Sequence, residues 1–196
     1  MKPSILALAA TALALPAVAQ ETREMDAHVH GVSTAQIALE HGALEINITA
    51  PGMDIVGFEY AANAKADKDA VEAAIRQLST PENVVTLPDA AGCRLTEVLS
   101  HLHTGDAHED DEHGHDHAEP MDDDDHGHAE HADVAQHSEF HVRYIFACEN
   151  EDALTTIGFP FFAAFENARE IEAQYVTETG AGVADLTRDA SELALQ

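Results

Sequence analysis

The residues of this chain that could do chemistry are histidines, concentrated in one short segment. Eleven of the fourteen histidines fall between His101 and His141, in a stretch that is otherwise mostly acid, glycine and alanine. Neutral imidazole offers a lone pair near neutral pH and is the commonest protein ligand for borderline divalent metals. So many imidazoles in so short a segment have no ordinary role in a core. The pattern therefore predicts metal handling, with Zn²⁺ as the favoured ion.

The spacing of these histidines suits shared coordination. Zinc takes about four N, O or S ligands, and an H-x-H pair lets two imidazoles reach one ion from an extended chain. The interspersed carboxylates, including the aspartate run 122–125, can fill coordination positions and attract cations. Ordering a flexible segment costs entropy, so each such site should be weaker than a preformed one. The predicted ligands here are His101, His103, His108, His113, His115, His117, His126, His128, His131 and His137.

The net charge of the chain limits its partners. A formal charge of −28 argues against nucleic acid and anionic lipid surfaces and favours cations. Zinc binding should weaken as the pH falls through the imidazole pKa of about 6.5, because protons compete with the metal. We also expect the acidic surroundings to raise the imidazole pKa values.

The first nineteen residues read as a secretory signal peptide. Lys2 supplies the positive charge, residues 5–15 form an apolar run, and an A-x-A site ends at Ala19. This pattern predicts cleavage between Ala19 and Gln20. The apolar run is too short to span a bilayer. The expected mature protein, residues 20–196, is exported and does not insert into a membrane.

The rest of the chain predicts one β-rich α+β domain whose sheet is antiparallel. Apolar residues alternate with polar ones, as in strands, and one stretch with Val71, Ala74, Ile75 and Leu78 on one face indicates the main helix. Residues 102–137 contain too few large apolar side chains to offset their ordering entropy, which predicts a disordered insertion. The expected strands are 28–40, 44–48, 55–60, 84–87, 93–99, 138–148, 154–157 and 170–176, with a last pairing of Leu186 with Leu193; the expected helix is 65–78.

The strand pattern also predicts a second metal site, on the sheet itself. His28 and His30 share the face of the first strand that is opposite to its apolar residues, and His141 lies on the corresponding face of its own strand. The three imidazoles would meet on the outer face of the sheet if these strands are close together. Three histidines would leave a fourth position for water, a carboxylate or another histidine. His41, at a turn, reads as a surface residue.

The two cysteines have two possible roles. Cys93 and Cys148 both lie in predicted strands, and an even pair in an exported protein favours one disulfide. The alternative is a thiolate metal site. The wide separation of the two cysteines, and the lack of a C-x-x-C motif, favour the disulfide.

Several of these features together resemble the zinc-regulated periplasmic histidine-rich proteins of Gram-negative bacteria, the ZrgA type. They are the signal peptide, the His28-x-His30-Gly31 opening, the PGMDIVGFE sequence at 51–59, the cysteine pair and the internal His/Asp segment. The resemblance implies periplasmic zinc binding in support of zinc uptake, with His28, His30 and the segment histidines as ligands and no known catalysis. It also implies a partner such as a periplasmic zinc solute-binding protein or an ABC importer.

Two other classes of function stay open. H-x-H spacing also binds Cu²⁺ and Ni²⁺, but the chain has only four methionines and the predicted mature N-terminus lacks a histidine at its third position. A zinc-dependent hydrolase would need more ordered ligands and a base, and the chain has no H-E-x-x-H, G-x-S-x-G or P-loop motif. A conventional solute-binding subunit would be a longer chain with alternating βα units.

Overall fold

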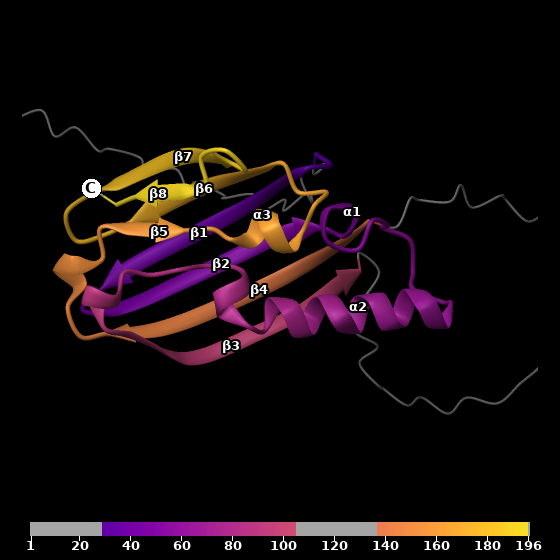
Figure 1. Cartoon of the computed structure of the whole chain (residues 1–196), viewed down its shortest axis with the longest axis horizontal. Helices are drawn as coiled ribbons and strands as arrows, with labels where there is room; N and C mark the ends of the chain where they lie inside the picture. Colours follow the sequence, from indigo (N-terminus) through magenta and orange to yellow (C-terminus); the bar gives the residue numbers. More distant parts are fainter. Residues whose placement is uncertain (1–28, 105–136, 196) are drawn as a thin grey trace, which may run out of the picture.

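A six-stranded sheet organises the part of the chain that the computed structural model describes, residues 29–104 and 137–195 (Figure 1). The strands are β1 Val32–Glu40, β2 Ala43–Pro51, β3 Cys93–Thr104, β4 Ser138–Cys148, β5 Thr156–Gly158, β6 Glu170–Val176, β7 Ala181–Thr187 and β8 Glu192–Ala194. The helices are α1 Gly52–Ile55, α2 Lys65–Leu78 and α3 Phe161–Ala164. The large sheet has the order β3-β4-β2-β1-β6-β7, and β5 pairs with β8 in a second, two-stranded sheet.

Some of the predictions fall outside the described residues. These are the signal peptide with its cleavage between Ala19 and Gln20, the ligand His28 and most of the His/Asp segment. The segment histidines concerned are His108, His113, His115, His117, His126, His128 and His131.

The alternating sequence pattern produces a sheet with one buried face. On β2, Ile46 and Ile48 are almost completely buried, whereas Glu45 and Asn47 on the other face remain partly exposed. Strand β4 shows the same alternation, with Tyr144 fully buried and donating its hydroxyl proton to the backbone carbonyl of Leu78 at the end of α2. The apolar face therefore packs under α2, and the opposite face of the sheet stays polar.

The predicted fold class is confirmed, and so are several elements. Helix α2 and strand β6 have the predicted bounds, and β1 and β2 form the predicted hairpin. The turn of this hairpin places His41 at a φ of 51°, and its side chain is 89 % exposed, as expected for a surface residue. The aromatic residues Phe159, Phe161 and Phe162 are buried in the core.

Three local predictions are wrong. Residues 55–60 do not form a strand, because the chain turns through α1 after Pro51 and continues irregularly to residue 64. The stretch 84–87 contributes only an isolated bridge between Thr86 and Gly158. Leu186 and Leu193 do not pair, since they lie on β7 and β8 in different sheets, although both are buried. In addition, one strand pair of the otherwise antiparallel sheet, β1 with β6, is parallel.

The predicted disulfide is present and fastens one end of the β3–β4 pair. Cys93 lies directly opposite Cys148 in the register, and the two are joined over a sequence separation of 55 residues. Both cysteines of the chain are therefore used, which excludes the thiolate alternative in this structure. The disulfide fixes the register of β3 against β4 independently of the residues between the two strands.

We predict that replacing both cysteines by alanine lowers the free energy of unfolding by about 2–4 kcal/mol. A cross-link that closes a loop of this length restricts the unfolded chain by about 4 kcal/mol in the chain-entropy picture. Urea unfolding of the oxidised protein and of the C93A/C148A variant measures the difference. Dithiothreitol should lower the stability of the wild type to that of the variant and leave the variant unchanged. Equal stability of the oxidised protein and the variant would contradict the prediction.

Candidate metal-binding region

The histidines that the structure describes gather at one end of the large sheet, except His41. At this end β1 and β4 begin and β2 and β3 end, and Thr104 pairs with Ser138 across the last rung of β3 and β4 (Figure 1). Residues 105–136 therefore connect the two strands at the same end, opposite to the disulfide. The histidines concerned are His30, His101, His103, His137 and His141.

Two of these histidines contact one carboxylate. The Nε2 atom of His30 lies 3.0 Å from Oε2 of Glu59, and Nδ1 of His137 lies 2.9 Å from the same oxygen. The Glu59 side chain is only 10 % exposed, whereas the imidazoles are about half exposed. The carboxylate and the two imidazoles are side chains of the types that serve as zinc ligands. We call these three residues the Glu59 cluster.

The sequence at 51–59 explains how Glu59 reaches this position. A side chain at Gly52 would place its Cβ 2.4 Å from Oγ of Ser138 and 2.6 Å from the carbonyl oxygen of Phe58. Only glycine therefore allows the chain after β2 to fold back against the first residue of β4. Gly57 has a φ of 82°, a left-handed conformation that favours glycine. Together these glycines bring Glu59 beside His137.

A buried aspartate positions His30 from the other side. Asp54, 1 % exposed, accepts a hydrogen bond from the backbone N–H of Gly31 (2.7 Å) and one from the hydroxyl of Ser33 (3.4 Å). Burial raises the pKa of Asp54, although both hydrogen bonds act in the opposite direction. His30 thus lies in a turn before β1, which begins at Val32; the prediction that this strand starts at residue 28 is wrong in its bounds.

A second group of histidines lies on the polar face of β3 and β4. His101 is directly opposite His141, and His103 is opposite Glu139. The ring centres of His101 and His103 each lie 5.4 Å from the ring centre of His141, and Nε2 of His141 lies 3.2 Å from Oε2 of Glu139. We call His101, His103 and His141 the three-histidine cluster. Strand β3 continues to Thr104, so the predicted boundary of the insertion at residue 102 is wrong on this side.

Burial and the neighbouring rings lower the pKa of one imidazole in this cluster. Partial burial lowers the pKa of His101, and the adjacent His141 and His103 lower it further. The expectation that acidic surroundings raise the imidazole pKa values is therefore wrong for His101, because burial and two neighbouring imidazoles both lower its pKa. A lowered pKa keeps this imidazole neutral, which is the form that binds a metal.

The structure does not bring all of the sequence-predicted ligands together. His30 and His141 belong to different clusters. His30 precedes β1 and His141 lies on β4, and β2 separates these two strands in the sheet. Within residues 29–104 and 137–195, no group of three or more His, Cys, Asp or Glu side chains is already arranged so that it could hold a metal ion. Across the same ranges, no helix is long and apolar enough to cross a membrane.

Three acidic residues at this end escaped the sequence analysis: Asp54, Glu59 and Glu139. Asp54 and Glu59 belong to the stretch 51–59, which contributed only to the family resemblance, and its glycines were the available signal of a tight turn. Glu139 sits between His137 and His141 at the two-residue spacing that places side chains on one face of a strand.

We predict that Asp54→Ala lowers the free energy of unfolding by about 1–3 kcal/mol, because it leaves the buried N–H of Gly31 without its acceptor. Asp54→Asn keeps an acceptor oxygen, and the raised pKa of Asp54 shows that folding does not favour its charge. The asparagine variant should therefore stay within about 1 kcal/mol of the wild type. Urea unfolding at pH 7.5 compares the three proteins. An alanine variant as stable as the asparagine variant would show that Asp54 does not hold the turn.

Comparison with known proteins gives one finding about the family. No curated protein sequence matches the chain. A family model described as the ZrgA family zinc uptake protein matches residues 27–195, which cover both clusters and the segment between them. The match extends over most of the chain and agrees with the resemblance drawn from its motifs, so the chain belongs to the ZrgA family of zinc uptake proteins.

Proposed function

We propose that this protein captures Zn²⁺ in the periplasm and supports zinc uptake, with the histidines of residues 105–136 collecting the ion and fixed histidines at the end of the sheet receiving it. Membership of a zinc uptake family supports the general role. The signal-like sequence at 1–19 supports the periplasmic location, and the density of histidines in 105–136 supports collection. The family is one of zinc uptake proteins, so catalysis forms no part of the proposal.

The observation that carries this proposal is the Glu59 cluster. Two imidazole nitrogens and a carboxylate oxygen are a donor set typical of zinc sites that keep a position open for water or an incoming ligand. Two ligand atoms on a tetrahedral zinc ion lie about 3.3 Å apart, given zinc–ligand bonds of about 2.0–2.1 Å. The N···O distances of 3.0 and 2.9 Å are slightly shorter. A zinc ion would therefore replace the two contacts with Glu59 after a small outward shift of the half-exposed imidazoles.

Charge favours the same assignment. The chain carries a formal charge of −28, and Glu59 is less exposed than Glu139 and Glu178, the other carboxylates seen beside a histidine in the described part of the chain. A divalent cation at this point offsets the cost of burying the carboxylate better than one protonated imidazole. His28, two residues before His30, remains a predicted further ligand. An open coordination position would allow zinc to pass to a periplasmic solute-binding protein or an ABC importer.

Replacing residues 105–136 by a short Gly/Ser turn tests the division of labour. Thr104 and Ser138 already pair, so a turn of a few residues should close the hairpin without disturbing β3 and β4. Zinc calorimetry at pH 7.5 should then show that most of the binding equivalents disappear while tight binding at the sheet end remains. Loss of all binding would place the whole metal-binding capacity in the removed segment. Unchanged stoichiometry would contradict the collecting role.

Glu59→Gln tests the fixed position directly. The change removes the negative charge and keeps the size of the side chain, and we expect the tightest zinc affinity to fall at least about tenfold, since the loss of even an outer-shell partner of a metal ligand costs about that much. Glu172→Gln is the matched control, because Glu172 lies exposed on β6 and pairs across to Thr34 and Asp185 in the register. Competition with a chromophoric zinc chelator measures both affinities. Equal zinc affinities of the two variants would show that Glu59 is not a zinc ligand.

A further inference from the structure

The three-histidine cluster is built by the register of two ordered strands. His141 alternates along β4 with the buried Phe140 and Val142, so its imidazole projects from the polar face of the sheet. His101 lies directly opposite on β3 and projects from the same face, as does His103 two residues further along. Three imidazoles from neighbouring strands thus meet without any contribution from residues 105–136.

The spacing of the rings fits coordination to one ion. With zinc–nitrogen bonds of about 2.0–2.1 Å, an imidazole centre lies about 3.2 Å from the ion, and two such centres at the tetrahedral angle lie about 5.2 Å apart. The centres of His101 and His103 are each 5.4 Å from that of His141. The nitrogens do not converge as they stand, since the described side chains form no ready metal group. The rings must therefore turn, and this is feasible because His101 is exposed and the other two are half-buried.

Glu139 orients the central imidazole. An ionised carboxylate only accepts hydrogen bonds, so the 3.2 Å contact with Nε2 of His141 favours the tautomer with its proton on that nitrogen. The lone pair then lies on Nδ1. A carboxylate that holds the far nitrogen of a metal-binding histidine is the usual support for such a ligand, because it fixes the tautomer and increases the basicity of the ring.

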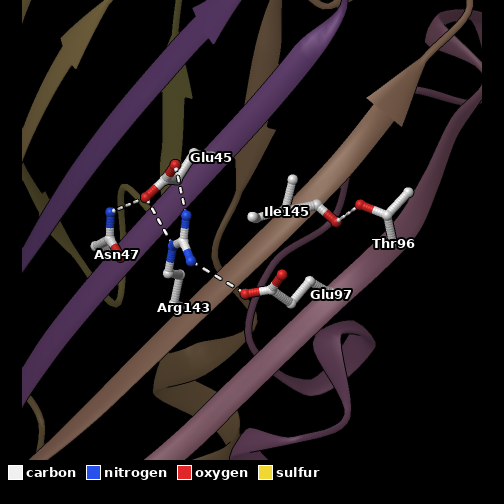
Figure 2. Close-up of polar contacts among 6 residues, drawn as sticks. All are labelled: Glu45, Asn47, Thr96, Glu97, Arg143 and Ile145. Atoms are coloured by element: carbon white, nitrogen blue, oxygen red, sulfur yellow. Dashed lines mark hydrogen bonds and ion pairs between the residues drawn. The ribbon is translucent and has the colours of Figure 1, made fainter.

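Two carboxylates fix the guanidinium of Arg143, a positive charge close to the three-histidine cluster. Arg143 lies two residues from His141 on the same face and would repel a cation if its guanidinium reached the imidazoles. Figure 2 shows it between two acids instead: its Nε and Nη2 donate to Glu45 (2.8 and 3.2 Å) and its Nη1 donates to Glu97 (3.0 Å). A shallow hollow beside His101 and His141 is lined also by Thr49 and by Arg143, whose guanidinium group is bound by these two acids.

We propose that His101, His103 and His141 form a second zinc position, separate from the Glu59 cluster, with its fourth coordination position open to water or to an exchanging ligand. The proposal rests on the zinc role proposed above and adds a site that needs no carboxylate in its inner sphere. Three neutral imidazoles leave the full double charge on the ion, so this site should bind zinc more weakly and release it faster than one with a carboxylate ligand.

The test uses the full-length protein, with zinc at buffered free concentrations. The variants H101N, H103N, H141N and the triple variant are compared with H41N, in which the exposed turn histidine changes to a residue that tolerates its left-handed conformation. Native mass spectrometry counts the bound ions, and imidazole NMR signals follow each ring during a zinc titration. Each single variant and the triple variant should lose the same one equivalent of zinc, and H41N should lose none. In the wild type, the three signals should shift in one step.

Two results would overturn the proposal. The triple variant could bind as many zinc ions as the wild type, or the three imidazole signals could respond to zinc independently of one another. Either result would leave the collecting role and the Glu59 cluster intact. Failure of the wild-type protein to bind any zinc would instead defeat the proposed function itself. Thermal unfolding of each variant confirms that the β3–β4 pair remains folded.

Discussion

The arrangement of the candidate metal-binding region depends on one buried hydrogen bond, from the backbone N–H of Gly31 to the carboxylate of Asp54. This bond ties the turn before β1 to the short helix α1 after β2. The close approach of Gly52 to Ser138 ties the same helix to the start of β4. Three distant segments are thereby held at one end of the sheet, and His30 and His137 meet Glu59 there. Without this hydrogen bond the turn that carries His30 would not be held beside Glu59 and His137.

The two ends of the β3–β4 pair differ in what they carry: a disulfide at one and histidines at the other. The disulfide of Cys93 with Cys148 fixes the register at one end, and the histidines lie at the other, where residues 105–136 connect the strands. Because a shift by one residue would turn His101 and His141 toward the core, the register decides whether the imidazoles face solvent together. The covalent link therefore preserves the geometry of the three-histidine cluster from a distance.

The spacing of apolar residues within a single helix or strand was enough to predict several elements of the fold. The spacing of Val71 and Leu78 was enough for α2, and alternation was enough for β1, β2, β4 and β6. The parallel pairing of β1 with β6 was not predictable, because it joins strands about 140 residues apart and local periodicity does not encode partners. Residues 55–60 were mistaken for a strand because their turn depends on contacts of Gly52 with β4. His101 and His103 were assigned to the insertion because few apolar residues surround them, although pairing with β4 orders them.

The difference between the two clusters suggests an order in which zinc would occupy them. The Glu59 cluster offers a nearly buried carboxylate, which neutralises part of the zinc charge, whereas the three-histidine cluster offers imidazoles alone. Zinc reaching the sheet from residues 105–136 would exchange more rapidly on the three imidazoles, which leave its double charge uncompensated, and stay longer beside Glu59. Protons compete with zinc, because an imidazole that gains a proton loses the lone pair that binds the metal. A fall in pH through the imidazole range would therefore release zinc from both clusters.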